Sequence, residues 1–211
     1  MKVLAIGAHP DDIELGCGAT LAKHASQDTE VRAVVVTNGE AQRGVQWQER
    51  IREAREAQNV LGGGVAFFLG IEERNVCTVE HRLVERIRQE IERFRPDVLY
   101  CHSEHDRHQT HQAVAQATVI AAHLENIPRV FKFEVPSANP KFAPTAYSDV
   151  TMCMDAKLAA LSCYESQAER YYMLPRAIEG LAHYRAYQMR FDGEGDIIPA
   201  AEAFEVERMV L

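Results

Sequence analysis

Two short stretches of this 211-residue chain hold most of the side chains that could do chemistry. The first is the His-Pro-Asp-Asp run at residues 9–12, and the second is the His-Gln-Thr-His run at residues 108–111. Imidazole and carboxylate groups are typical ligands of Zn²⁺ and also suit Fe²⁺ or Mn²⁺. A catalytic zinc site needs three protein ligands and one open position, which a His and an Asp from the first run and a His from the second would supply.

The two runs contain acid–base groups beyond such a set of ligands. Asp11 and Asp12 are adjacent and point different ways, so one could bind the metal while the other takes a proton from water. His108 and His111 are three residues apart, so one could bind the metal while the other acts on an oxyanion or a leaving group. Together these groups predict a metal-assisted amide or ester hydrolase.

The predicted elements place both runs at one edge of a sheet. Apolar runs rich in β-branched residues predict strands at 3–7, 30–37, 65–69, 97–101 and 129–135. Helices are predicted at 19–25, 47–61 and 79–94, and from the second run to about residue 124. This alternation predicts an α/β fold with a mostly parallel sheet flanked by helices on both faces. Ligands bind such sheets at the carboxyl ends of the strands, where we expect the two runs to meet.

The last third of the chain has a different pattern. Prolines at 136, 140 and 144 predict an irregular segment. A strand at 147–152, helices at 155–166 and 175–190, a loop at 191–199 and a strand at 203–210 are predicted after it. We therefore expect a single domain over residues 1–211, with an α/β core at 1–135 and a small carboxyl-terminal extension at 136–211.

Composition limits the classes of partner. The formal net charge of -8 argues against a nucleic-acid or anionic-membrane surface. No apolar run is long enough to span a bilayer, and no signal-peptide pattern is present, so we expect a cytoplasmic protein. The five cysteines form no Cys-x-x-Cys pair, which predicts neither a disulfide framework nor a thiolate zinc site. An acidic chain with aromatic carboxyl-terminal helices is compatible with a homo-oligomer.

Both runs resemble the motifs of the PIG-L/LmbE-like family of metal-dependent de-N-acetylases. The chain has Ala-His-Pro-Asp-Asp at 8–12 after an amino-terminal strand, and Asp-x-His-x-x-His at 106–111. The likeness continues through Thr-Asn-Gly-Glu at 37–40 and Arg-x-x-Glu-Ala at 50–54, and weakly to Lys157 and Ser-Gln at 166–167. It therefore spans most of the chain, although only the two His/Asp motifs are specific. It implies a Rossmann-like α/β fold, a zinc ion and removal of acetyl from N-acetylglucosaminyl groups or related amides.

The resemblance also implies roles for individual residues. The metal ligands would be His9, Asp12 and His111. Asp11 would be the general base that activates water, and His108 would stabilise the tetrahedral oxyanion or protonate the leaving amine. One further match, Arg50, corresponds to an arginine that lies near the substrate in family members.

The chain departs from the family pattern at one position. Many members carry His-x-Asp-His, whereas this chain has Thr110 where the Asp would stand. A carboxylate partner orients a histidine and favours its protonated form, and a threonine brings no charge. Asp106 is the candidate to compensate. We expect Thr110 to affect the pKa of His108 and its strength as an acid. We expect a smaller effect on metal binding.

Several of these residues have an ordinary structural alternative. Asp11 could instead cap the following helix, and Arg50 could belong to a solvated helix face with i,i+4 ion pairs. Glu40 could contact the substrate or be a simple turn residue. His102 and His105 stand close to the second run in sequence and could line the mouth of the site.

The expected substrate is a soluble N-acetylglucosamine conjugate or a related N-acetylated amino sugar. One alternative is hydrolysis of a non-sugar amide or ester by the same centre. The other is a sugar- or nucleotide-binding module in which the two runs hold a structural ion with a closed coordination shell. The chain lacks the Gly-x-Gly-x-x-Gly loop of a dinucleotide site, which weakens this second alternative.

Overall fold

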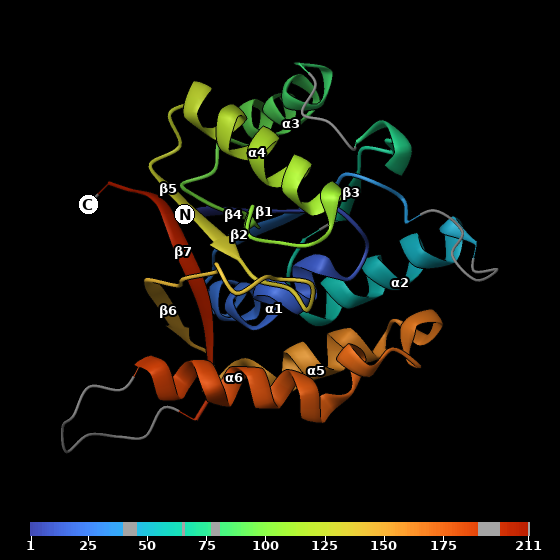
Figure 1. Cartoon of the computed structure of the whole chain (residues 1–211), viewed down its shortest axis with the longest axis vertical. Coiled ribbons are helices and arrows are strands. Elements are labelled where there is room, and N and C mark those ends of the chain that lie inside the picture. Colours follow the sequence, from blue (N-terminus) through green and yellow to red (C-terminus); the bar gives the residue numbers. More distant parts are fainter. Residues whose placement is uncertain (40–45, 65, 77–80, 190–198, 211) are drawn as a thin grey trace.

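The computed structural model describes residues 1–39, 46–64, 66–76, 81–189 and 199–210. Its centre is a seven-stranded sheet in the order β3-β2-β1-β4-β5-β7-β6 (Figure 1). The strands are β1 (Lys2–Gly7), β2 (Glu30–Val35), β3 (Ala66–Phe68), β4 (Val98–His102), β5 (Arg129–Phe133), β6 (Ala146–Asp149) and β7 (Ala201–Met209). The first five are parallel, and β7 runs antiparallel to both of its neighbours. The predicted mostly parallel α/β fold is confirmed.

Helices cover both faces of this sheet. The helices are α1 (Asp12–Ala25), α2 (Trp47–Val60), α3 (His81–Phe94), α4 (Gln109–Leu124), α5 (Met154–Ser162) and α6 (Pro175–Met189). α3 and α4 pack on one face, while α1 and α2 lie on the other with α5 and α6 outside them (Figure 1). Four 3₁₀ turns complete the described elements, namely η1 (Glu73–Asn75), η2 (Thr151–Cys153), η3 (Glu165–Gln167) and η4 (Tyr171–Met173). None of the helices in the described part of the chain could cross a membrane.

The central strand β1 shows why the sheet forms in this order. Its apolar residues are buried on both faces, as expected for an inner strand of a parallel sheet. Leu4 and Ile6 pack into the core beneath α3 and α4, whereas Val3 and Ala5 pack into the core beneath α1. Because β2 and β4 lie on opposite sides of β1, strand order reverses at β1 and β4. The loops that follow these two strands therefore leave the sheet side by side.

The first helix begins earlier than its glycines suggest. The sequence predicts a helix from residue 19, but α1 begins at Asp12 and passes through a kink at Cys17, whose φ and ψ are -144° and 18°. Gly16 has a packing role there, because a Cβ atom at this position would lie 2.2 Å from the Phe133 ring. Gly16 therefore does not form a turn before the helix. It lies within α1 and allows this helix to pack closely against β5.

The carboxyl-terminal segment continues the central sheet. β7 pairs with β5 on one side and with β6 on the other. The predicted strand at 147–152 is shorter in the structure, ending at Asp149, and the predicted helix at 155–166 ends at Ser162 before η3. Three features of the sequence analysis lie outside the described residues. They are Glu40, the start of the helix predicted at 79–94 and most of the loop predicted at 191–199.

Candidate active site

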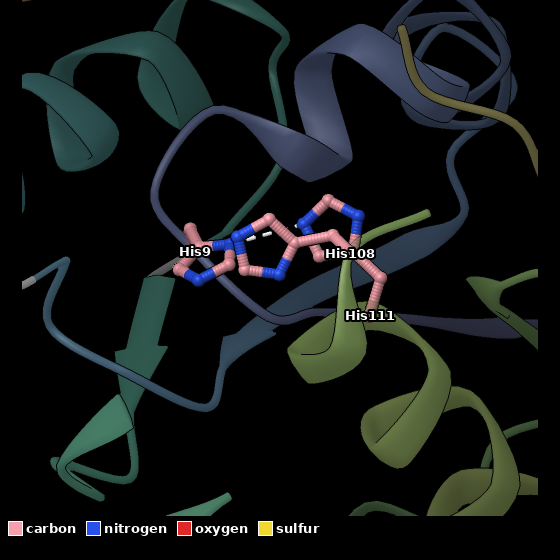
Figure 2. Close-up of side chains that lie close together, drawn as sticks. All are labelled: His9, His108 and His111. Atoms are coloured by element: carbon pink, nitrogen blue, oxygen red, sulfur yellow. Dashed lines mark hydrogen bonds between the residues drawn. The ribbon is translucent and has the colours of Figure 1, made fainter. Parts of the chain in front are cut away.

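Side chains from the two runs meet at the carboxyl edge of the sheet (Figure 2). His9 stands in the loop after β1, and His108 and His111 stand at the start of α4. The ring centroid of His9 lies 4.9 Å from that of His108 and 5.1 Å from that of His111. The reversal of strand order at β1 and β4 thus brings together residues that are about a hundred positions apart in the sequence.

Three donor atoms converge on one point in this cluster. His9 Nδ1 lies 3.2 Å from Asp12 Oδ2 and 3.1 Å from His111 Nε2. Asp12 Oδ2 and His111 Nε2 are 3.4 Å apart. A tetrahedral zinc ion with bonds of about 2.0–2.1 Å has neighbouring donor atoms about 3.3 Å apart. The type and the spacing of these donors therefore fit a single metal ion.

In both imidazoles of this set, a carboxylate contacts the ring nitrogen that faces away from the common point. The second nitrogen of His9, Nε2, lies 3.1 Å from Glu73 Oε1. The second nitrogen of His111, Nδ1, lies 3.1 Å from Asp106 Oδ2. Such carboxylate–histidine pairs orient the rings of metal ligands and raise their basicity. Each ring is thereby held with one nitrogen facing the common point.

Charges around this point favour a cation. Burial by itself would lower the pKa of His9, but hydrogen bonds to Asp12 and Glu73 outweigh it and raise the pKa to about 10. Burial likewise opposes ionisation of Asp12, but His111 and His102 outweigh it and hold the pKa well below its usual range. The carboxylates of Asp12 and Glu73 thus stabilise positive charge on His9, and a metal cation at this point would be stabilised by the same negative charges.

Two other sets of side chains could also hold a metal ion. One set is His9, His108 and His111, and the other is Asp12, His102 and His111. Within each set the possible ligand atoms all lie within 4.8 Å of one another. His102 is fully buried behind the site, with its Nε2 atom 3.1 Å from Asp12 Oδ2 and its ring stacked on that of His111. The hypothesis that His102 lines the mouth is therefore wrong. His105 points elsewhere, because its Nδ1 atom lies 2.9 Å from Oε1 of Glu205 on β7.

Asp11 has a backbone conformation that few acidic residues adopt. Its φ is 103°, in a region where a side chain costs on the order of 1–2 kcal/mol. It occupies the position before α1, yet within the described chain its side chain makes no capping hydrogen bond, which argues against the capping alternative. The carboxylate is buried, and burial raises its pKa to about 7 although Arg50 opposes the rise.

Arg50 belongs to the site and not to a solvated helix face. It projects from α2 and is only 7 % exposed. Its Nη2 atom donates to the Pro10 carbonyl oxygen and lies 3.2 Å from Asp11 Oδ2. The guanidinium group thus fixes the loop that carries the first run and pairs with its first carboxylate.

His108 has a different carboxylate neighbour from the one suggested by the sequence. Its Nδ1 atom accepts a hydrogen bond of 3.3 Å from the Thr110 N–H, and its Nε2 atom lies 3.6 Å from Glu73 Oε1. Asp106 instead accepts from the backbone N–H of His108 and bonds the ring of His111. Burial lowers the pKa of His108, and His111 lowers it further. The expected compensation by Asp106 is therefore not made at the His108 ring.

Glu73 is a site residue that the sequence analysis missed. It begins η1, which follows β3, so it stands at the same edge of the sheet as both runs. Its Oε1 atom faces both His9 and His108 and lies 3.3 Å from the Thr110 hydroxyl group. The argument that brought the two runs together would also have indicated this residue, since it too comes shortly after a parallel strand.

A cavity of about 250 Å³ opens onto these groups. It is lined by side chains from the loop after β1, from α2, from the start of α4 and from the η3 region, among them His9, Asp11, Asp12, Arg50, His108, His111, Gln167 and Arg170. The converging donor atoms therefore lie on a cavity wall that a small molecule can reach. This arrangement differs from a closed structural metal site, in which protein ligands occupy every position.

Residues 4–122 match the family model described as PIG-L, GlcNAc-PI de-N-acetylase. The chain belongs to the PIG-L family. The resemblance carried by the two runs is confirmed by this match. An "uncharacterized deacetylase YaiS" of Escherichia coli K12 is 35% identical over 174 residues, which cover 78% of this chain and 90% of that protein.

Solved structures share the fold of this PIG-L protein. GalB, the 4-carboxy-2-hydroxymuconate hydratase of Pseudomonas putida KT2440, has a TM-score of 0.80 at 21% identity, covering 100% of this chain and 97% of its own. The N,N'-diacetylchitobiose deacetylase of Pyrococcus horikoshii has a TM-score of 0.75 at 20% identity, covering 97% of this chain and 83% of its own. At these identities the likeness establishes the fold, and a fold shared by a hydratase and a deacetylase does not by itself specify the reaction.

Proposed function

We propose that this PIG-L protein is a zinc-dependent de-N-acetylase that releases acetate from an N-acetylglucosamine conjugate or a related amino sugar. The observation that carries the proposal is the convergence of His9 Nδ1, Asp12 Oδ2 and His111 Nε2 within 3.4 Å of one another. These atoms lie on the wall of a cavity that also presents Asp11 and His108. The description of the family and the chitobiose deacetylase with the same fold support an N-acetylated sugar as substrate.

His9, Asp12 and His111 would hold the metal ion. When bound, Zn²⁺ would lower the pKa of water and polarise the acyl oxygen, and the same donors suit Fe²⁺ or Mn²⁺. Glu73 and Asp106 fix the two imidazoles in the orientation that this requires. The protein therefore supplies a site whose geometry is set before the substrate arrives.

Asp11 would act as the general base. A carboxylate with a pKa near 7 accepts a proton efficiently at neutral pH, and burial raises the pKa of Asp11 to about 7. It takes one proton from the attacking water as the new carbon–oxygen bond forms. Arg50 holds this carboxylate in place through its contact with Oδ2.

His108 would stabilise the tetrahedral oxyanion. Because Nδ1 accepts from the Thr110 N–H, the neutral ring carries its proton on Nε2, and this N–H would donate a hydrogen bond to the oxyanion. As the carbon–nitrogen bond breaks, Asp11 returns the proton that it took from water to the amine, and the products are the free amine and acetate.

The alternatives make different predictions about the same site. A non-sugar amide or ester would use the same groups and would differ only in the substrate that is hydrolysed. A binding module with a structural ion would have a closed set of ligands, whereas the donor atoms here face a cavity of about 250 Å³.

The test is acetate release from a panel of N-acetylglucosaminyl compounds, N-acetylated amino acids and acetate esters. The purified protein is assayed after chelation and after addition of Zn²⁺, Fe²⁺ or Mn²⁺. We expect acetate to be released from the amino sugars. Chelation should abolish this release, and added zinc should restore it. Release confined to the amino acids or esters would overturn the sugar assignment, and no release by protein that holds one metal per chain would overturn the hydrolase assignment.

A further inference from the structure

A second cavity of about 220 Å³ lies beside the active-site cavity. It is enclosed by α6, α1, the segment after β5 and the start of β7. The two cavities share four wall residues, which are Leu15, Val135, Pro136 and Tyr172. The second cavity therefore adjoins the cavity of the candidate active site along these four residues.

The charged side chains around this second cavity are paired with one another. Arg185 Nε and Nη2 donate to the two carboxylate oxygens of Glu134 at 2.6 and 2.7 Å. Lys157 Nζ lies 2.6 Å from Glu202 Oε1 and also donates to the Leu15 carbonyl oxygen. Since these charges satisfy each other, an occupant does not need to supply a counter-charge.

Most of the remaining wall is apolar. The largest part is formed by side chains of α6 and β7, namely Ala177, Ile178, Leu181, Ala182, Ala201 and Ala203. An apolar cavity of about 150 Å³ accommodates benzene, so one of this size accommodates a ring or chain of roughly six to ten carbon atoms. Leu181 and Tyr171 are 38% and 73% exposed, so the wall of the cavity reaches the surface at α6 and η4.

We propose that this second cavity is a substrate subsite for an uncharged hydrocarbon group of about six to ten carbon atoms. The proposal rests on the proposed amide hydrolysis, because it names a second feature of the same substrate. The group would be either an acyl chain longer than acetyl or an apolar substituent on the anomeric oxygen of the amino sugar. In both cases its burial adds binding energy without changing the chemistry at the metal site.

Two series of substrates separate these sources. One series is N-acyl glucosamines from acetyl to decanoyl, and the other is alkyl N-acetylglucosaminides from methyl to decyl. We expect kcat/KM to rise about two- to fourfold per methylene in one series and to level off when the cavity is filled. The series that rises identifies the source. A flat or falling dependence in both series would overturn the proposal.

Two variants test whether the effect arises in this cavity. Leu181→Asp places a charge in the apolar wall, and Ala177→Phe adds a ring to that wall and reduces the space in the cavity. Both residues are exposed on α6, so the core is left intact. Each variant should reduce the ratio of kcat/KM between the six-carbon member and the shortest member of the rising series to about one. Tyr187→Asp is the matched control, because Tyr187 is 71% exposed on the same helix and does not line this cavity. A ratio that is unchanged in both variants would contradict the assignment.

A binding measurement distinguishes failure of this proposal from failure of the proposed function. Hexyl β-D-glucoside has a hydrocarbon chain but no amide, and methyl β-D-glucoside lacks the chain. If the anomeric substituent is the source, calorimetry should show at least tenfold tighter binding of the hexyl compound and loss of that difference in Leu181→Asp. If this difference appears while no amide is hydrolysed, the subsite stands and the hydrolase assignment fails. Equal binding of the two glucosides, together with a flat dependence in both substrate series and with acetate release, would reverse that conclusion.

Discussion

At the scale of single residues, Asp11 combines strain, burial and a charged partner. Its φ of 103° is retained although the conformation is unfavourable, and its carboxylate is buried beside Arg50. Strained backbone of this kind is maintained where the surrounding structure requires a side chain to point in one direction. At Asp11 that direction is toward the cavity which also contains the predicted metal ligands.

Replacement of the proposed base should separate metal binding from turnover. Asp11→Asn keeps the size of the side chain but removes the proton acceptor, so kcat should fall by roughly 10²- to 10⁴-fold while zinc affinity changes little. Steady-state kinetics and a zinc titration measure the two quantities. Asp155→Asn, an exposed position on α5, should behave like the unsubstituted protein. Normal turnover by Asp11→Asn would show that Asp11 is not the base.

The charge of Arg50 should set the acidic limb of the pH profile. Its positive charge favours the ionised form of Asp11 and so lowers the pKa of that carboxyl group. In Arg50→Gln the pKa rises, less of the base is ionised at a given acidic pH, and the limb of kcat/KM moves to higher pH. Arg52→Gln is the control, since Arg52 lies on the same helix and pairs with Glu56 at the surface. A limb that stays in place or moves to lower pH in Arg50→Gln would exclude this electrostatic role.

Glu73 should contribute to metal affinity through His9. Glu73→Gln removes the charge that faces His9 Nε2, and loss of such an outer partner typically weakens metal binding by about 10- to 100-fold. Competition with a zinc-binding dye measures this change without any substrate. Glu72→Gln is the neighbouring control, because Glu72 instead pairs with Arg74 near the surface. Equal zinc affinities in the two variants would remove Glu73 from the metal site.

At the scale of elements, the close packing of α1 against β5 depends on Gly16, because glycine has no side chain. A Cβ atom at Gly16 would lie 2.2 Å from Phe133, which is fully buried and has little room to move. The same helix carries Asp12 at its first turn, so the position of the site depends on this packing.

Two glycine substitutions should therefore have opposite effects on stability. Gly16→Ala forces α1 away from Phe133 and should lower the free energy of unfolding by about 1–3 kcal/mol. Gly180 is an exposed position of α6, and no atom lies within 4 Å of a Cβ added there. Gly180→Ala should therefore raise the free energy of unfolding by about 0.5–1 kcal/mol. Urea denaturation followed by circular dichroism measures both. A neutral or stabilising Gly16→Ala would show that the contact relaxes without cost.

At the scale of the whole molecule, we propose that residues 1–211 form a single domain. Three observations support this proposal. β7 lies between β5 and β6 in one sheet. Glu202 on β7 accepts hydrogen bonds from the Ala19 and Thr20 N–H groups of α1. The same carboxylate pairs with Lys157 of α5, so one buried group ties together three elements.

Unfolding should accordingly be a single cooperative transition. The core elements and the carboxyl-terminal segment share contacts, so neither can lose its structure without exposing apolar surface of the other. Far-ultraviolet and near-ultraviolet circular dichroism should give coincident thermal curves. Separate transitions would indicate that residues 136–211 unfold independently of residues 1–135.

The local pattern of the sequence was enough to predict the order of strands and helices and the meeting of the two runs. Apolar runs and polar turns are short-range signals, and parallel strands connected by helices must present their carboxyl ends at one edge. Contacts between distant residues required the tertiary structure. It brought Glu73 to His9, paired Asp106 with His111 instead of the His108 ring, inserted β7 into the sheet and formed the apolar cavity under α6. These features depend on strand register and helix packing, which arise only when the whole chain is folded and which no short stretch of sequence encodes.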